Sequence, residues 1–166
     1  MTMKILTLVR HAKSSWSDSN LSDRQRPLNK RGKTDAPVMG KRIAEHGIRP
    51  SLIVCSPAKR AWSTAKIIAR EISYPIEFLQ REDSLYLASL DEFLDVLVAQ
   101  DNEFNSIMVV GHNPGMTDFA NFLSPGLTHN LPTAGVVSVE IDQDHWNLYE
   151  RPKTRLLVHD YPKKPG

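Results

Sequence analysis

The sequence predicts one α/β domain with a mainly parallel central sheet flanked by helices. Short apolar runs rich in β-branched residues alternate with longer segments of helical periodicity, which is the pattern of strand–helix–strand units. The chain has 166 residues and is 40% hydrophobic, which is enough for a single domain with a substantial core. Near its end, apolar and polar residues alternate, which predicts an antiparallel hairpin at one edge of the sheet.

Four parallel strands are predicted in chain order, each from a short apolar run. They cover residues 4–9, 51–55, 76–79 and 106–110. The hairpin completes the sheet: residues 135–141 form one strand, residues 142–144 turn, and residues 146–149 return antiparallel to the first.

Helical segments separate these strands. The first covers residues 29–46 and ends before Gly47, which can adopt the left-handed conformation that closes a helix. Pro37 lies inside this segment and predicts either a kink or a later start. Three further helices cover residues 57–71, residues 90–100 and the stretch after Pro114. The tail, residues 161–166, is expected to be frayed.

Composition excludes several classes of protein. The net charge of 21 − 19 = +2 implies no general affinity for nucleic acid or membranes. A single cysteine, Cys55, excludes disulfide frameworks and cysteine-based zinc sites, and we expect it to face the core. No apolar stretch is long enough for a signal peptide or a bilayer span, so the expected location is the cytoplasm.

Positive charge is concentrated near the amino terminus. Between Arg10 and Arg42 there are nine lysines and arginines against three aspartates, a local charge of +6. Such a surface would attract phosphorylated partners, although a solvated basic face explains the pattern equally well.

Three of the predicted strands are followed by side chains that suit a phosphate. Arg10 and His11 follow the first strand, and His112 follows the fourth. Arg60 lies one turn into the helix after the second strand. Because ligands bind beyond the carboxyl ends of the strands in open α/β sheets, these four side chains are expected to converge. A guanidinium binds phosphate oxygens and an imidazole nitrogen can attack phosphorus. The alternative is that all four residues have structural roles. Arg10 and His11 would then bond the backbone at the strand end, His112 would stabilise a turn, and Arg60 would be a cation on the helix surface.

The motifs resemble a known family. Arg10-His11, Ser56-Pro57-x-x-Arg60 and Gly111-His112 are similar to the motifs of the histidine phosphatase superfamily, which includes the cofactor-dependent phosphoglycerate mutases. The small size, the segment Arg26-Pro27-Leu28-Asn29-x-x-Gly32 and the lack of a large inserted cap most resemble the SixA-type phosphohistidine phosphatases. The resemblance implies a three-layer, phosphoglycerate mutase-like fold in a small uncapped version, formed by residues 1–166 as one domain.

The resemblance also implies a mechanism without metal ion or cofactor. His11 attacks phosphorus and is transiently phosphorylated, and water then hydrolyses the intermediate. One nitrogen of His11 must be unprotonated, and we expect a backbone carbonyl to hold the other. Arg10, Arg60 and His112 bind the equatorial phosphate oxygens, which makes these four residues the predicted catalytic set.

The sequence offers two candidates for the proton donor to the leaving group, Glu82 and Asp83. Larger members of the family place a glutamate after the third strand, and both residues lie in the matching region. A loop or capping role is equally open for each. Three more residues are predicted to contact substrate: Ser17, Arg26 and Asn113. Ser17 could instead be a solvated loop residue, and Arg26 could form a structural salt bridge.

The implied substrate is phosphohistidine on a protein, such as a phosphorelay domain in signal transduction. An imidazole leaves far more readily than an alkyl alcohol, so this substrate depends least on a proton donor. The alternative within the superfamily is a phosphatase for small phosphorylated metabolites. A less favoured alternative is a phosphoprotein-binding module without turnover.

Overall fold

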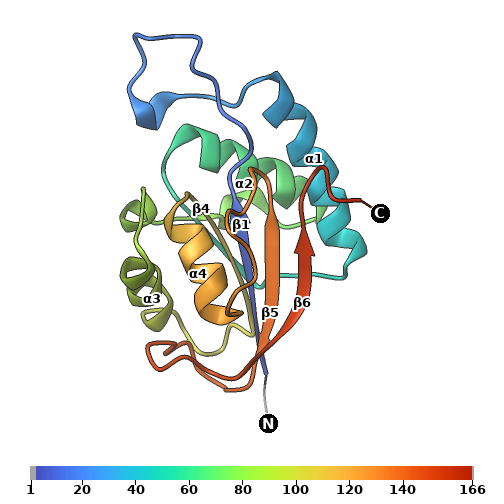
Figure 1. The fold of residues 1–166 in the computed structure, drawn as a ribbon, viewed down its shortest axis with the longest axis vertical. Coiled ribbons are helices and arrows are strands. Elements are labelled where there is room, and N and C mark those ends of the chain that lie inside the picture. Colours follow the sequence, from blue (N-terminus) through green and yellow to red (C-terminus); the bar gives the residue numbers. More distant parts are fainter. Residues whose placement is uncertain (1–2, 166) are drawn as a thin grey trace.

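The structure, a computed structural model, describes residues 3–165 and contains one six-stranded mixed sheet. The strands are β1 (Lys4–Arg10), β2 (Leu52–Cys55), β3 (Gln80–Arg81), β4 (Ser106–Gly111), β5 (Val136–Ile141) and β6 (Thr154–Asp160). Their order is β3-β2-β4-β1-β5-β6. Figure 1 labels the neighbouring strands β4, β1, β5 and β6. The first four are parallel, and β5 runs antiparallel to both of its neighbours. The predicted α/β fold with a mainly parallel sheet is therefore confirmed.

Four α-helices flank the sheet. They are α1 (Lys30–Glu45), α2 (Lys59–Glu71), α3 (Leu90–Val98) and α4 (Gly115–Leu123). The Asn29 side chain accepts a hydrogen bond from the Gly32 amide at 2.8 Å and so caps the start of α1. Pro37 lies inside α1, which excludes the later start, and Gly47 follows the helix with φ of 77°. Among residues 3–165, no helix has the length and apolar character needed to cross a membrane.

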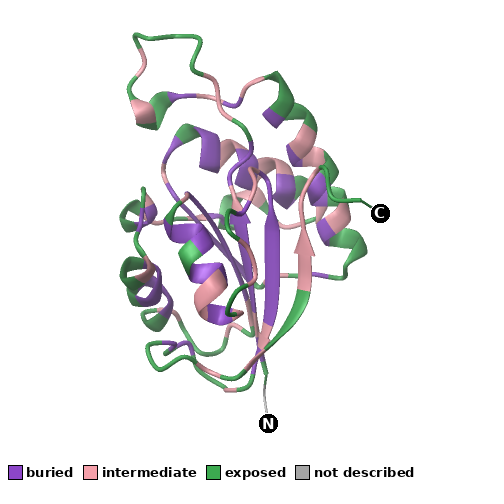
Figure 2. Cartoon of the chain, in the orientation of Figure 1, coloured by how far each residue is buried: buried purple, intermediate pink, exposed green. Residues whose placement is uncertain are grey.

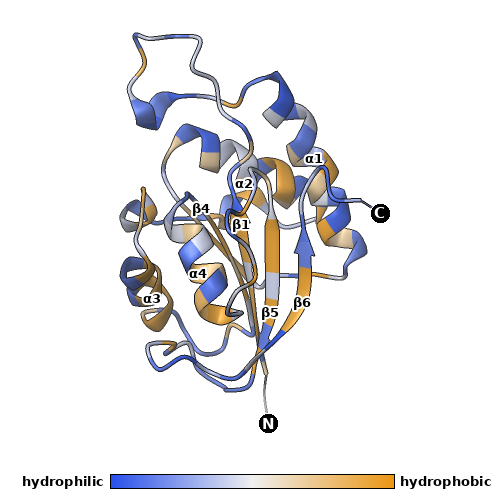
Figure 3. Ribbon diagram, viewed as in Figure 1, coloured by the Kyte–Doolittle hydropathy of each residue, from blue (hydrophilic) through white to orange (hydrophobic). Residues whose placement is uncertain are grey.

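The helices cover both faces of the sheet and create two hydrophobic cores. Leu6 and Leu8 of β1 pack on one side with the aromatic rings of α3 and α4. Val9 packs on the other side with apolar side chains of α1 and α2, as does Cys55 at the end of β2. Figure 2 shows buried strands between helices that are exposed on their outer faces. Figure 3 shows the hydrophobic residues concentrated on the central strands and the inward helix faces. The result is a three-layer α/β/α domain.

The third predicted strand is wrong in position. Residues Ile76–Phe78 form a 3₁₀ turn, and the strand is only the two residues Gln80–Arg81. The Tyr74 hydroxyl accepts a hydrogen bond from the Ile53 amide at 3.3 Å and donates to the Phe78 carbonyl at 3.0 Å. Tyr74 therefore occupies the edge of β2 where a longer strand would pair.

The returning strand of the predicted hairpin is also wrong. Residues 146–149 form no strand, and the partner of β5 is β6, which begins at Thr154. Trp146 is fully buried, and its indole N–H donates to the Phe104 carbonyl at 2.9 Å. The apolar residues of this segment thus fill the end of the core instead of pairing with β5.

The carboxyl-terminal tail begins with anchored residues. The Arg42 guanidinium of α1 donates to the carbonyls of Tyr161 and Pro162, at 3.0 and 3.4 Å. Residue 166 lies outside the described residues, and fraying of the tail stays a prediction.

Substitution of Gly32 tests the packing of α1 against the segment that follows β1. A Cβ atom at Gly32 would lie 2.1 Å from the Lys13 carbonyl oxygen. Because backbone cannot give way as a flexible side chain can, we expect Gly32→Ala to lower the free energy of unfolding by about 1–3 kcal/mol in denaturant titrations. Lys33→Ala, an exposed neighbour, is the control and should change it by less than about 0.5 kcal/mol. Equal effects would show that the Lys13 segment moves freely away from α1.

Candidate active site

The candidate site lies at the carboxyl ends of three adjacent strands. Arg10 of β1 lies opposite Gly111 of β4, and the His11 amide donates to the Gly111 carbonyl at 3.1 Å. On the other side of β4, the Ser56 amide donates to the Val110 carbonyl at 3.1 Å. The pairing of the sheet therefore places the residues that follow β1, β2 and β4 at one edge.

A cavity of about 430 Å³ opens at this edge. Arg10, His11, Arg60 and His112 all line it, so the structure brings together the four residues predicted to be catalytic. The ring centroids of His11 and His112 are 5.1 Å apart. His11, Arg60 and His112 are buried, with 7%, 2% and 1% of their surfaces exposed.

The imidazole of His11 is held in one tautomer. Its Nδ1 lies 2.7 Å from the Ala12 carbonyl oxygen, which can only accept, so Nδ1 carries the proton and Nε2 is the free base. Burial lowers the pKa of His11 to about 4; the hydrogen bond to Ala12 opposes this shift, and the charges of the surrounding arginines add to it. The ring is therefore neutral and unprotonated at Nε2 around pH 7.

Each of the other three residues is anchored by hydrogen bonding to one other residue. The Arg10 guanidinium donates to the Leu131 carbonyl at 2.9 Å. Arg60 donates to the Asp23 backbone carbonyl at 2.6 Å and to its carboxylate at 2.9 Å. His112 Nε2 lies 2.7 Å from the Ser56 hydroxyl. Burial lowers the pKa of His112 to about 3, and the charges of the nearby His11 and Arg60 contribute to this shift in the same direction. Sequence reasoning placed Ser56 in a motif but missed this contact.

Each anchored side chain also has a buried nitrogen without a partner. Arg10 Nε, Arg60 Nε and His112 Nδ1 make no hydrogen bond within the part of the chain that the structure describes. A buried donor without a partner costs about 1–3 kcal/mol, so three at one pocket need an explanation. The side chains that carry these nitrogens line one cavity, and cationic side chains gathered in this way bind anions with several oxygen atoms.

Asp23 is the main residue that sequence reasoning missed. Its carboxylate lines the cavity and accepts hydrogen bonds from Arg60 at 2.9 Å, from Arg26 at 3.1 Å and from the Tyr86 hydroxyl. Partial burial would raise the pKa of Asp23, but the hydrogen bonds from Tyr86 and Arg60 outweigh it and hold the pKa at about 2. The one sequence signal is its position three residues before Arg26, a spacing typical of local ion pairs.

The three residues predicted to contact substrate differ in their position relative to the cavity. Arg26 is buried in the cavity wall, where it donates to the Ser14 hydroxyl at 2.7 Å and to Asp23. Asn113 lines the cavity, but its amide bonds Leu131 and Thr117. Ser17 is exposed outside the lining and bonds Ser15. Arg26 is thus the best placed of the three to meet a ligand.

Neither predicted proton donor lines the cavity. The Glu82 carboxylate accepts a hydrogen bond from the Ser84 hydroxyl at 3.0 Å and caps a short turn. Asp83 is mostly exposed and pairs with Arg81 at 3.2 Å. The acid role of both residues stays a prediction. Among residues 3–165, no group of three or more His, Cys, Asp or Glu side chains is placed to hold a metal ion.

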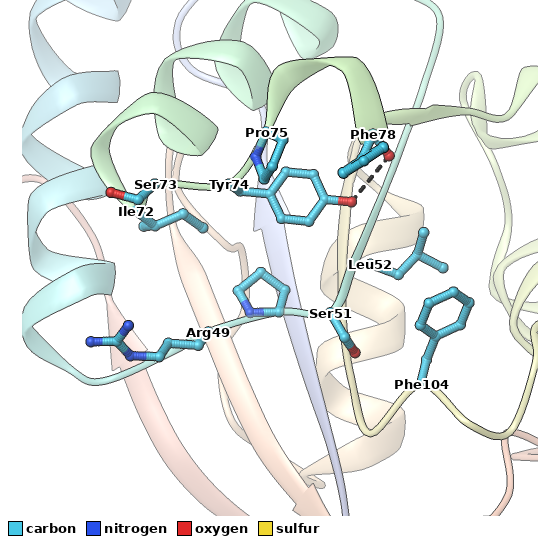
Figure 4. A pocket seen from close by; sticks show the side chains of 10 residues that line it. Arg49, Ser51, Leu52, Ile72, Ser73, Tyr74, Pro75, Phe78 and Phe104 are labelled. Carbon is cyan, nitrogen blue, oxygen red and sulfur yellow. Dashed lines mark hydrogen bonds between the residues drawn. The ribbon is translucent and has the colours of Figure 1, made fainter.

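A larger cavity, about 660 Å³, lies at the opposite end of the sheet, beside the starts of β2 and β4. Figure 4 shows the aromatic rings of Tyr74, Phe78 and Phe104 around it, with Arg49 at one side. Among residues 3–165, Arg49 is its only charged lining residue, and no histidine or cysteine lines it. Size alone would favour this cavity, but the reactive side chains gather in the smaller one.

Comparison of the sequence with known families and proteins gives matches along the chain. Residues 6–82 match the model of the histidine phosphatase superfamily, branch 1. An uncharacterized chloroplastic protein of Arabidopsis thaliana is 32% identical over 149 residues, which cover 85% of this chain and 68% of that protein.

Solved structures share the fold. A protein from Agrobacterium tumefaciens, named as a candidate phosphohistidine phosphatase SixA, superposes with a TM-score of 0.82 at 27% identity. The match covers 96% of this chain and 98% of that one. A protein histidine phosphatase SixA in complex with tungstate gives a TM-score of 0.78 at 21% identity, covering 95% and 97% of the two chains.

Titration of His11 tests the electrostatics of the pocket. We expect its imidazole to titrate near pH 4 by NMR, with the signal assigned by its loss in His11→Gln. In the unfolded chain the pKa of this histidine is near 6.5. The unfolded chain therefore binds more protons than the folded chain between pH 6.5 and pH 4, and the free energy of unfolding decreases as the pH falls through this range. A titration at pH 6 or above would contradict the desolvated, cation-lined pocket.

Removal of the Asp23 charge tests its role as counter-ion. Asp23→Asn leaves the buried Arg60 and Arg26 without an anionic partner, so we expect a free energy of unfolding lower by about 1–3 kcal/mol. Inorganic phosphate should then raise the melting temperature more than it does in the wild type, because it replaces the lost charge. Asp18→Asn, an exposed aspartate of the same loop, is the control. Equal phosphate shifts in all three proteins would contradict the counter-ion role.

Proposed function

Because this chain belongs to the histidine phosphatase superfamily, we propose that it hydrolyses phosphohistidine on proteins through a covalent phosphohistidine intermediate on His11, without a metal ion. The proposed setting is the cytoplasm, with a phosphorelay domain as the partner. One observation carries the proposal: His11, whose Nε2 is free, lines one cavity with Arg10, Arg60 and His112.

The proposed first step is attack by His11 Nε2 on phosphorus. The bond from phosphorus to the leaving group breaks, and the leaving group keeps the electron pair. Charge spreads over the equatorial oxygens, which accept hydrogen bonds from the guanidinium groups of Arg10 and Arg60 and from the imidazole of His112, all of which line the cavity. The Ala12 carbonyl stabilises the positive charge that develops on the His11 ring.

The second step is hydrolysis of phosphorylated His11. Water attacks the same phosphorus, the P–N bond to His11 breaks, and the ring returns to its neutral form with the proton still on Nδ1. The same three donors hold the phosphoryl oxygens in both steps. Loss of any one of them should slow turnover by roughly 10²–10³-fold, by analogy with other preorganised donors to a developing oxyanion.

The choice of phosphohistidine as substrate rests on the leaving group. Asp23 is the one carboxylate among the cavity-lining residues, and its ion pairs keep it ionised near neutral pH, so it does not supply a proton. An alkyl alcohol needs such a donor, whereas a phosphorylated imidazole can leave with a proton taken up from solvent on its other nitrogen. The name of the A. tumefaciens protein, which is 27% identical, supports the same choice.

Substrate comparison tests this function. We expect His11-dependent turnover of an aryl phosphate and a kcat/KM for a phosphohistidine-bearing protein at least about 10²-fold above that for sugar phosphates or phosphoglycerate. His11→Ala should abolish all turnover, and His129→Ala, at an exposed histidine outside the cavity, should not.

Two more variants address the proton donor. Glu82→Gln and Asp83→Asn should leave phosphohistidine hydrolysis within about twofold of wild type, because neither side chain lines the cavity. A strong preference for a small alcohol phosphate would overturn the substrate assignment and favour a metabolite phosphatase. Binding of phosphoprotein without any His11-dependent turnover would instead indicate a binding module.

A further inference from the structure

Two large apolar side chains stand exposed at the mouth of the candidate active site. Trp16 is 77% exposed and Leu87 is 54% exposed, and both line the cavity that contains His11. Trp16 belongs to the loop after β1, and Leu87 to the turn before α3. Single exposed apolar residues are common, but two from separate segments at the rim of one reactive pocket call for a reason. We call this pair the apolar rim.

Leu87 occupies a strained backbone position. Its φ is 50°, in the left-handed region that bulky residues rarely adopt. The next residue, Ala88, is buried so tightly against α4 that a Cβ on Gly115 would lie 1.9 Å from the Ala88 carbonyl oxygen. The chain therefore turns sharply at Leu87, in a conformation that glycine would adopt at lower cost, and an apolar side chain is nevertheless present there.

Trp16, in the other segment of the rim, packs against a cation. The guanidinium carbon of Arg26 lies 3.5 Å from the centroid of the indole. Arg26 is itself fixed by hydrogen bonds to Ser14 and Asp23 and is only 7% exposed. The indole is thus supported by a rigid group while most of its surface faces solvent.

We propose that the apolar rim binds the polypeptide around the phosphorylated histidine, so that Trp16 and Leu87 select phosphorylated proteins over small phosphohistidine compounds. The proposal rests on the proposed function and names the part of the substrate that this rim recognises. A phosphoryl group seated among Arg10, Arg60 and His112 leaves its imidazole at the mouth, where the neighbouring apolar side chains of a protein can cover the two exposed residues.

Charge near the rim indicates the kind of protein surface that fits. Lys13 is exposed and lines the cavity beside Trp16. Arg24 is also exposed, and its guanidinium lies 5.0 Å from the centroid of the Tyr86 ring. Tyr86 directly precedes Leu87 in the chain. A surface with apolar side chains next to the phosphohistidine and carboxylates around them would complement both features. A sugar phosphate would place hydroxyl groups against the rim, which offers them no hydrogen-bond partner on the indole face or the leucine.

The test compares two substrates that share one leaving group. One is a small acidic protein whose single histidine has been phosphorylated with phosphoramidate, and the other is the free amino acid phosphohistidine. The quantity of interest is the ratio of kcat/KM for the protein to kcat/KM for the amino acid. We expect this ratio to fall about 10-fold or more in Trp16→Ala and in Leu87→Gly, and further in the double variant.

Leu87→Gly also separates recognition from folding. Glycine suits the positive φ, so the melting temperature should not fall while the ratio does. Phe78→Ala, at an apolar residue that is 65% exposed beside the other cavity, is the matched control and should leave the ratio unchanged.

The outcomes distinguish the two proposals. An unchanged ratio in both rim variants, or an equal fall in Phe78→Ala, would overturn the role of the rim while leaving the phosphatase assignment intact. Absence of His11-dependent hydrolysis of either substrate by the wild-type chain would overturn the proposed function itself.

Discussion

The candidate site depends on keeping one imidazole neutral among packed guanidinium groups. Burial of His11 disfavours its protonated form, and the charges of Arg60, Arg10 and Arg26 disfavour it further. The same cations would repel one another without a counter-ion, and Asp23 supplies one negative charge to two of them. That single carboxylate leaves the pocket with excess positive charge, so a phosphate dianion would complete the balance. One arrangement thus both frees the proposed nucleophile and favours its substrate.

Helices α1 and α2, on one face of the sheet, fix the chain that follows β1. Parallel pairing brings the ends of β1, β2 and β4 to one edge, but the chain after β1 must still be fixed. The Ala12 amide donates to the Thr64 hydroxyl of α2 at 2.9 Å, and the Asn29 amide before α1 donates to the Lys13 carbonyl at 3.0 Å. Helices on one face of the sheet therefore hold both residues that follow His11. Such support is what keeps reacting groups within the narrow tolerance that catalysis requires.

Sequence reasoning reached the parts of the site that depend on local pattern. Arg10 ends β1, His11 follows it and His112 follows β4, so their positions could be predicted from the ends of the apolar runs alone. Asp23 and Tyr86 could not be found this way, because they lie 63 residues apart in segments without periodicity and meet only in the folded chain. The misplaced third strand has a similar cause: an apolar run predicts a strand, but the Tyr74 hydroxyl already occupies the edge of β2. Trp146 shows the same ambiguity, since a buried loop and a strand can share a composition.

The chemistry of the pocket and the shape of its mouth are both consistent with the proposed substrate. The carboxylate of Asp23 accepts hydrogen bonds from Arg26, Arg60 and Tyr86, which hold it in its ionised form. A pocket of this kind suits a leaving group that does not depend on the protein for a proton, and a phosphorylated imidazole is such a group. The exposed Trp16 and Leu87 contribute nothing to that chemistry, yet both are held at the mouth at a conformational or solvation cost. Such a cost without a catalytic return is the mark of a recognition surface, and for the proposed substrate the group that would reach this surface is the protein that carries the histidine.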